Sequence, residues 1–257
     1  MEPILFEIEK AVAIITLNRP QKFNAFNREM ALLFQQKLDD CQAEHIRAVY
    51  ITGMGKAFCA GQDLEGVIDA NAPGMDRILK EHFNPMIEKI WALPKPVIAA
   101  VNGVAAGAGA NIALSCDIVV AAASANFIQA FSKIGLVPDS GGTFMLPRLI
   151  GWQKASALMM TGDKVPAAEA ERMGMIYKVF SDDYFGDESK QLAFRLAQMP
   201  TKGLALTKKA LQLSGRNTLI EQLAVEDEMQ QQAAETNDFK EGVQAFIEKR
   251  TPVFKGN

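Results

Sequence analysis

The segment from Asn102 to Thr143 constrains the fold of this chain more than any other part of its sequence. A strand pattern over 96–102 runs into a corner of glycine and alanine at 103–110, and apolar residues at helical spacing follow. The first amides of a helix have no intrahelical acceptor, so the corner predicts backbone N–H groups that can bind an anion. The small residues of the corner would let a ligand oxygen come close to these amides. Close packing of a helix start on a sheet explains the same glycines, so the corner alone does not establish a site.

The glycine pattern does not fit the known nucleotide-binding loops. Gly103, Gly107 and Gly109 match neither G-x-G-x-x-G nor the P-loop, and no Gly-Lys-Ser/Thr follows them. The turn 53–56, which comes after a strand pattern at 48–52, fails the same test. Phosphate binding by these loops is therefore not expected.

Two carboxylates occur between the glycine corner and the next glycine pair. Asp117 precedes the apolar run 118–121, and we expect it to satisfy main-chain groups at the start of a strand. Asp139 follows a proline among apolar residues, where desolvation would raise its pKa and make it a better base near neutral pH. The same residue is also placed to cap a helix that opens at 141–143, and the pattern leaves both roles open.

Strand patterns recur through the first part of the chain. They cover 48–52, 97–101 and 118–122, and each ends at a polar or glycine-bearing turn with a helical pattern before the next. A hairpin over 3–17 precedes them, and Asn27 is expected to cap an amphipathic helix. The recurrence predicts an α/β fold in which ββα turns stack into neighbouring sheets.

The pattern changes at Pro200-Thr201-Lys202-Gly203, which we interpret as a boundary. Beyond it the sequence predicts three helices, over 204–213, 219–235 and 239–250. An apolar stripe runs along the second of them, at Leu219, Leu223, Met229 and Ala233. So small a helical module could hardly bury this stripe alone, and we expect it to dock against the core or another subunit.

Composition narrows the class of protein. At 257 residues and 49% hydrophobic, the chain can form one large core, and a net charge of −3 gives no basic surface for nucleic acid or an anionic membrane. No presequence pattern precedes residues 3–6, and the most apolar run, 97–114, is broken by polar and turn residues. Neither the cysteines nor the histidines have metal-ligand spacing: Cys41, Cys59, Cys116, His45 and His82. We expect a soluble cytoplasmic protein with reduced thiols and no metal.

Several motifs, taken together, resemble the enoyl-CoA hydratase/isomerase (crotonase) superfamily. They occur in that family's order along essentially the whole chain, at 58–64, 102–107, Asp117, 141–143 and 241–250. The resemblance implies a crotonase-like spiral of ββα turns over 1–200, with the CoA and acyl site, and a C-terminal helical trimerisation region over 201–257. It also implies an acyl-CoA thioester as substrate, with coenzyme A as part of it, no separate cofactor, and a homotrimer or a dimer of trimers.

The resemblance further assigns the catalytic groups. The family's oxyanion hole falls on the backbone N–H groups of Gln62 and Ala108. The two glutamates that its hydratases use to add water correspond to Asn111 and Phe131, neither of which can move those protons. Asp139 stands where isomerases carry their acid/base and where a dehalogenase branch carries a nucleophile, so the resemblance implies little or no hydration and a proton shuttle by Asp139.

The segments 103–110 and 130–139 are most similar to the isomerases of bacterial phenylacetate degradation. That branch converts the ring 1,2-epoxide of phenylacetyl-CoA to an oxepin and moves 3-enoyl-CoA double bonds to the 2-position. The alternatives are an enoyl-CoA hydratase or a nucleophilic-aspartate enzyme of the same superfamily. From another class, a non-catalytic scaffold that binds CoA or RNA remains open, although the acidic charge balance disfavours RNA.

The resemblance also predicts which residues contact CoA. Most lie in the loop after the hairpin and around the first oxyanion residue: Lys22, Phe23, Ala25, Lys56, Ala60, Gln62, Asp63 and Leu64. Phe246 and Lys249 would reach the CoA of a neighbouring subunit, although solvated charges would explain Lys22 and Lys249 equally. The segment 64–93 is expected to line the acyl pocket or to be ordinary helix core, with four candidate contacts at Val67, Leu79, Phe83 and Met86.

Overall fold

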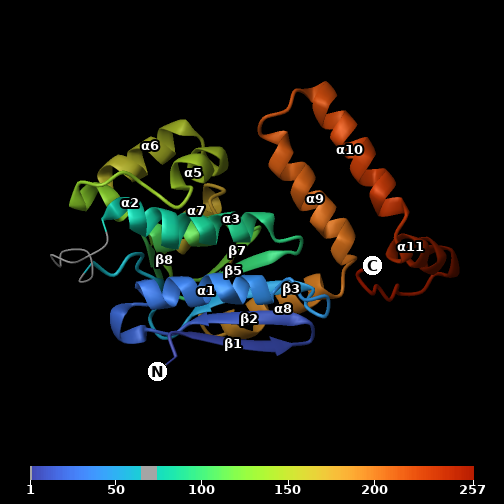
Figure 1. The fold of residues 1–257 in the computed structure, drawn as a ribbon, viewed down its shortest axis with the longest axis horizontal. Helices are drawn as coiled ribbons and strands as arrows, with labels where there is room; N and C mark the ends of the chain where they lie inside the picture. Colours follow the sequence, from blue (N-terminus) through green and yellow to red (C-terminus); the bar gives the residue numbers. More distant parts are fainter. Residues whose placement is uncertain (1, 65–73) are drawn as a thin grey trace.

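The main sheet has six strands within residues 2–64 and 74–257, which the computed structural model describes (Figure 1). In spatial order they are β1 (Ile4–Glu9), β2 (Val12–Leu17), β3 (Ala48–Gly53), β5 (Val97–Val101), β7 (Ile118–Ala122) and β10 (Lys178–Phe180). β1 and β2 form the predicted antiparallel hairpin, and the other neighbours pair in parallel. β3 and β5 are buried almost throughout, as expected of parallel strands that are covered on both faces.

A second, smaller sheet runs beside the first. Its strands are three residues long: β4 (Ala57–Cys59), β6 (Val104–Ala106), β8 (Asn126–Ile128) and β9 (Lys164–Pro166). β4, β6 and β8 pair in parallel, and each directly follows β3, β5 or β7 in the chain. Successive turns of the chain therefore pass from one sheet to the other and return through helices, which confirms the predicted stacking of ββα turns.

Two long helices pack side by side on this core, α1 (Arg28–Asp40) and α3 (Asn84–Ala92) (Figure 1). Asn27 caps α1 as predicted, because its side-chain oxygen accepts a hydrogen bond from the Met30 amide at 3.0 Å. The chain reaches α3 through α2 (Met75–Ile78) and a π-helical turn, η3 (Leu79–Phe83). The predicted pocket residue Val67 lies outside the described residues.

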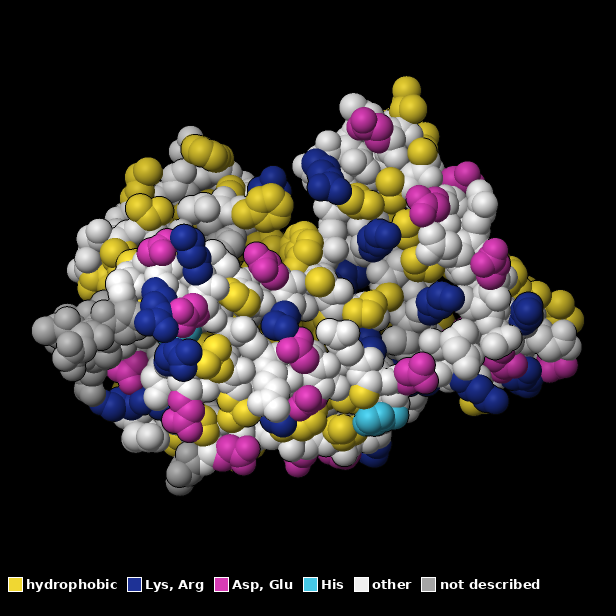
Figure 2. Space-filling model, viewed as in Figure 1, with side chains coloured by type: hydrophobic (Ala, Val, Ile, Leu, Met, Phe, Trp, Pro, Cys, Tyr) yellow, Lys and Arg dark blue, Asp and Glu magenta, His cyan; other side chains and the backbone are white. Residues whose placement is uncertain are grey.

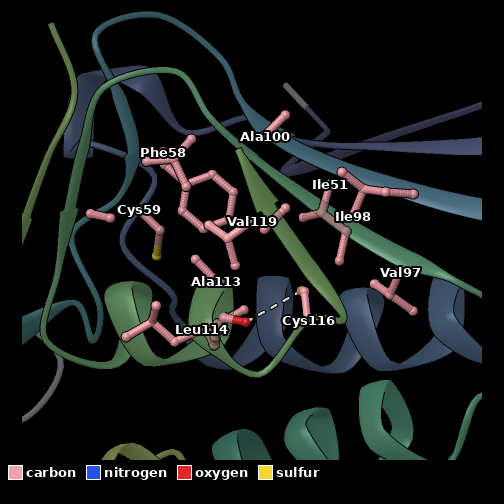
Figure 3. Close-up of a cluster of buried hydrophobic side chains, with 14 of the residues drawn as sticks. Ile51, Phe58, Cys59, Val97, Ile98, Ala100, Ala113, Leu114, Cys116 and Val119 are labelled. Atoms are coloured by element: carbon pink, nitrogen blue, oxygen red, sulfur yellow. Dashed lines mark hydrogen bonds between the residues drawn. The ribbon is translucent and has the colours of Figure 1, made fainter. Parts of the chain in front are cut away.

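The helix that follows the glycine corner, α4 (Ala108–Leu114), is buried along its whole length. Figure 3 shows Ala113 and Leu114 of α4 beneath Phe58 and Val119, which come from β4 and β7. Because strands of both sheets pack against it, the start of α4 has a fixed position relative to β4. The same helix start forms one wall of the cavity described below.

The remaining core elements complete the site and its surroundings. They are η1 (Pro20–Lys22), η4 (Ala130–Ile134), α5 (Gly142–Ile150), α6 (Trp152–Thr161), α7 (Ala167–Arg172) and α8 (Phe185–Ala197). η4 and α5 matter most for function, because the loop between them carries Asp139.

Three helices follow the core: α9 (Thr201–Ser214), α10 (Leu219–Ala234) and α11 (Asn237–Glu248). α9 begins at Thr201, three residues earlier than predicted and directly after Pro200, which is its N-cap residue. Figure 1 shows α9 and α10 as a hairpin that projects from the sheets, with α11 near the open end of the hairpin, on the side of the C-terminus. Of the predicted apolar stripe Met229 is buried, whereas Leu219 and Leu223 are 76% and 55% exposed.

Candidate active site

The glycine corner and Asp139 line one cavity of about 200 Å³. Its polar groups come from Gln62, Ala108, Lys133 and Asp139, while Ile78, Phe83 and Phe131 contribute apolar walls. Within the described part of the chain, Asp139 is the one carboxylate that lines it. Residues that are far apart in the sequence thus converge around a mostly apolar space, and they include the three that the resemblance assigned to the site.

The Gln62 and Ala108 amides are brought together by the backbone around Gly61. Gly61 has a φ of 92°, and a β-carbon on it would lie 3.2 Å from the Ala108 nitrogen. The Gly61 carbonyl accepts a bond from the Phe26 amide, and the Asp63 amide donates to the Phe26 carbonyl. In such a parallel bridge the Gln62 N–H points to the opposite side, away from Phe26.

Neither amide is used elsewhere in the described structure. Ala108 is the first residue of α4, so its N–H has no intrahelical acceptor. No hydrogen bond from the Gln62 or Ala108 amide to another described residue is present. The geometry therefore offers two main-chain donors at one wall of the cavity, which is the arrangement that stabilises a negative oxygen.

Asp139 lies on the turn between η4 and α5. The Ser140 hydroxyl donates to its Oδ1 at 2.8 Å. Burial raises the pKa of the Asp139 carboxyl, and the Ser140 hydrogen bond opposes that rise in part. The N-cap residue of α5 is Gly141, and no side chain makes a capping hydrogen bond there. The structure therefore does not show Asp139 as a helix cap, which was one of the two roles that the sequence left open.

The two positions that the resemblance assigns to the hydratase glutamates hold Asn111 and Phe131. Asn111 is fully buried in α4; its Nδ2 donates to the Asp139 carbonyl, and its Oδ1 accepts from Gln129 Nε2, both at 2.8 Å. The Phe131 ring packs near Gly107, where a β-carbon would lie 3.8 Å from it. Neither side chain can act as an acid or base.

The predicted CoA-binding loop packs against the strand that leads to Gln62. The Ala60 amide donates to the Phe23 carbonyl at 2.9 Å, and the Cys59 thiol donates to the Asn24 carbonyl. Asp63 is held by an ion pair with Arg19 at 2.9 Å. These contacts place most of the predicted CoA residues in one neighbourhood.

The exposure of these residues differs. Phe23, Lys56 and Leu64 are exposed and Lys22 is half-buried, while Ala25 is buried and contributes its carbonyl to Arg19. Leu64 also lines the cavity. The exposed and half-buried members of the set are therefore the ones that a ligand at the surface can reach.

Phe246 and Lys249 are not brought to this neighbourhood within one chain. Both are exposed at the end of α11, which Figure 1 places at the far end of the molecule from α2. Lys249 has a φ of 54° and terminates the helix. The fold of one chain therefore keeps these two residues apart from the cavity.

Of the candidate acyl-pocket residues, three lie in the described part of the chain, and one of these three lines the cavity. Phe83 lines the cavity, whereas Met86 is buried in the core and Leu79 packs against it. Ile78 and Met75 line the cavity and were missed. The π-helical turn at 79–83 changes the helical period, so the residues on the cavity side cannot be read from a 3.6-residue spacing.

Other predictions concern groups outside the cavity. Asp117 accepts a bond from the Val97 amide at 2.8 Å, as expected, and also pairs with Lys208. Within 2–64 and 74–257 no cluster of acidic, histidine or cysteine side chains is arranged to hold a metal ion. Across the same ranges no helix has the length and hydrophobicity of a membrane span.

Comparisons with known proteins place the chain among CoA enzymes. Residues 7–257 match the family described as enoyl-CoA hydratase/isomerase. The chain is 46% identical to the 1,2-epoxyphenylacetyl-CoA isomerase of Escherichia coli, over 100% of this chain and 99% of that one, and 44% identical to a protein of Rhodobacter capsulatus named probable enoyl-CoA hydratase, over 98% of each. The crystal structure of an enoyl-CoA hydratase from Bacillus anthracis superposes with a TM-score of 0.92 at 32% identity, covering 99% of this chain and 100% of that one.

Proposed function

The chain belongs to the enoyl-CoA hydratase/isomerase family, and from that premise we propose that it is an acyl-CoA isomerase with Asp139 as its acid/base. It would move the double bond of a 3-enoyl-CoA to the 2-position, or rearrange the ring 1,2-epoxide of phenylacetyl-CoA to an oxepin. One observation carries this proposal. Asp139 is the one carboxylate among the described residues that line a cavity also lined by Gln62 and Ala108, whose amides make no hydrogen bond to another described residue.

The proposed reaction begins at the thioester carbonyl. Its oxygen would accept hydrogen bonds from the Gln62 and Ala108 amides, which stabilise the negative charge that develops when a proton leaves the adjacent carbon. Asp139 takes that proton from C2, and the C2–H electron pair moves toward the carbonyl, which gives a dienolate whose negative oxygen the two amides hold. The carboxyl group then returns the proton to C4: the C3–C4 π electrons form the new C4–H bond, and the enolate electrons form the C2–C3 double bond as the carbonyl is restored.

The environment of Asp139 suits this role. Burial raises the pKa of its carboxyl, which makes the carboxylate a stronger base than an exposed aspartate. The apolar walls formed by Ile78, Phe83 and Phe131 exclude water from the enolate. Both features favour proton transfer between carbons over the addition of water.

Hydration is the second candidate, because a relative at 44% identity is named as a probable hydratase. Water addition needs one carboxylate to activate water and another to protonate carbon. In this chain Phe131 has no such group, and the Asn111 amide is engaged with Asp139 and Gln129. Hydration is therefore expected to be far slower than isomerisation.

A direct comparison of substrates tests the proposal. Purified protein is given 2-enoyl, 3-enoyl and ring-epoxide CoA thioesters, and hydration and isomerisation are measured separately. We expect turnover of the 3-enoyl or epoxide substrate and little hydration. Fast hydration of 2-enoyl-CoA, with no isomerisation, would overturn the proposal. A covalent acyl-enzyme at Asp139, detected by mass spectrometry, would point instead to nucleophilic catalysis.

We also propose that residues 201–257 mediate assembly into a trimer or a pair of trimers. Figure 2 shows hydrophobic side chains at the surface over α6 and along α9 and α10. The exposed apolar residues of these helices include Trp152, Met160, Leu211, Leu219 and Leu223. A neighbouring copy would cover such side chains and bring its Phe246 and Lys249 to CoA. Light scattering on the purified chain tests this, and a monomer at micromolar concentration would contradict it.

A further inference from the structure

We propose that Asn111 is a positioning residue that ties the Asp139 turn to the helix that carries the Ala108 amide. The inference rests on the proposed function, because it concerns the distance between the base and the two amides. It assigns a role to a residue that the sequence indicated only as a missing hydratase acid. Three observations support it.

The first observation is the direct contact. Asn111 Nδ2 donates to the Asp139 carbonyl oxygen at 2.8 Å, and the Gly142 amide donates to the same oxygen at 2.9 Å. A β-carbon at position 142 would lie 2.3 Å from Asn111 Nδ2. Glycine at the start of α5 therefore makes room for the carboxamide beneath the turn.

The second observation is the direction of the hydrogen bonds. The Asp139 carbonyl can only accept, so the NH₂ end of Asn111 must face it and the oxygen must face Gln129. Gln129, which is also buried, then presents its Nε2 to that oxygen at 2.8 Å. The two hydrogen bonds thus run in the same direction, from Gln129 to Asn111 and from Asn111 to the Asp139 carbonyl. The bond from Gln129 keeps the Asn111 carboxamide from rotating.

The third observation is where Asn111 lies. It is three residues after Ala108 on the same buried helix, so one rigid element carries an oxyanion donor and the support of the base. A shift of α4 would move both groups together. A glutamate at this position would place a carboxylate against the Asp139 carbonyl, and two acceptors repel each other. The turn that carries Asp139 therefore requires a carboxamide side chain at position 111. This requirement is separate from the absence of a hydratase glutamate there.

Asn111→Asp is the variant that tests this role, because its carboxyl can donate only when protonated. At pH 8 the ionised group would repel the Asp139 carbonyl, and we expect kcat for 3-enoyl-CoA isomerisation to fall about 10²-fold with KM changed by less than about threefold, as for a misplaced catalytic group. The ratio of variant to wild-type kcat should rise as the pH is lowered. Asn111→Leu, which cannot donate at any pH, should give a low ratio throughout.

A second readout does not depend on turnover. Hydrogen–deuterium exchange of the peptide 136–145 reports on the turn itself. Exchange should be faster in Asn111→Asp at pH 8 and return toward the wild-type level on acidification. Asn18→Asp is the matched control, since Asn18 is a buried carboxamide whose Nδ2 donates to the Glu2 carbonyl at 2.9 Å, away from the cavity. It should change neither kcat nor exchange of this peptide.

The outcomes separate the two proposals. A kcat ratio that does not vary with pH, or unchanged exchange of 136–145, would overturn the positioning role. Faster exchange with normal kcat would also overturn it, because the contact would then be structural only. If the wild type isomerises neither substrate, the proposed function fails, while the exchange experiment still decides whether Asn111 holds the turn.

Discussion

The two walls of the cavity are built by different means. On the oxyanion side, glycines let one main-chain segment approach another: a β-carbon on Gly109 would lie 2.2 Å from the Cys59 carbonyl, and one on Gly61 would lie 3.0 Å from the Ala106 carbonyl. On the base side a single carboxyl group is held by side chains, with Ser140 on its oxygen and Asn111 on its main-chain carbonyl. The first wall depends on backbone shape, and the second on side-chain chemistry.

This difference predicts opposite sensitivities to substitution. Truncation of the Gln62 side chain should matter little, because its main-chain amide remains, whereas a methyl group at Gly61 should matter greatly. At Asp139 the identity of the side chain is decisive, and at Ser140 it tunes the base. The following predictions test this contrast.

The largest expected effect is that of Asp139→Asn. Removing the proton acceptor should lower kcat for 3-enoyl-CoA by about 10³-fold, within the range for loss of a general base. Binding of an acyl-CoA, measured by calorimetry, should stay near the wild-type level because the amides are intact. A variant that isomerises at close to the wild-type rate would show that another group is the base.

The same variant has a predicted effect on stability, with a sign that follows from the pKa. Burial raises the pKa of Asp139, so the folded protein binds this proton more tightly than the unfolded chain does. The stability that this group contributes is present in acid and is lost as the pH rises through the raised pKa. Asp139→Asn should therefore melt above the wild type at pH 8, and the difference should shrink on acidification. If the variant melts at a lower temperature than the wild type at pH 8, the pKa of Asp139 is not raised in the folded protein.

Gly61→Ala should have the next largest effect. The φ of 92° disfavours any side chain, and the new methyl group would push against the Ala106 carbonyl and the Ala108 nitrogen. Displacing one oxyanion donor is expected to lower kcat about 10²-fold. Steady-state kinetics should be combined with a melting curve measured on the same sample. Normal kcat in a folded variant would mean that these amides do not face the reacting oxygen.

Ser140→Ala should have a smaller effect that depends on pH. Losing the hydroxyl donor at 2.8 Å removes the interaction that lowers the pKa of Asp139, so that pKa should rise further. The acidic limb of the kcat profile should move to higher pH, with a loss of kcat of about tenfold or less on the acidic side, where more of the carboxyl group is protonated. An unchanged acidic limb would show that the hydroxyl does not tune the base.

Gln62→Ala should have the smallest effect. Among the described residues the Gln62 side chain donates to the Asp63 carbonyl, at 3.1 Å, and the backbone bridge to Phe26 remains. We expect kcat/KM within about threefold of the wild type, as for a substitution that leaves the main-chain donor in place. A loss comparable with that of Gly61→Ala would mean that the side chain itself contacts substrate.

The sequence predicts the main sheet better than the second sheet, for a physical reason. β3, β5 and β7 are continuous apolar runs, whereas the strands of the second sheet have only three residues each and resemble turns. In the sequence, residues 103–109 therefore look like a corner alone, although this segment contains β6. Strand patterns therefore predict the main sheet, but not the short strands that frame the site.

The candidate site shows the same limit. Gln62, Ala108 and Asp139 were predicted from motifs that lie near them in the sequence, and they line one cavity. The bonds from Gln129 through Asn111 to the Asp139 carbonyl join residues 18 and 28 positions apart, and no spacing rule encodes them. The pairing of Ile78 with Phe83 on the cavity wall depends on a π-helical turn that no simple periodicity indicates.

The central claim is that Asp139 carries one proton between two carbons of the acyl chain while the amides hold the thioester oxygen. The most direct measurement uses 3-enoyl-CoA deuterated at C2 and locates the label in the 2-enoyl product by NMR. We predict that deuterium appears at C4 with the wild type, and that Asp139→Asn forms almost no product. Product without label at C4, formed equally fast by Asp139→Asn, would contradict the account.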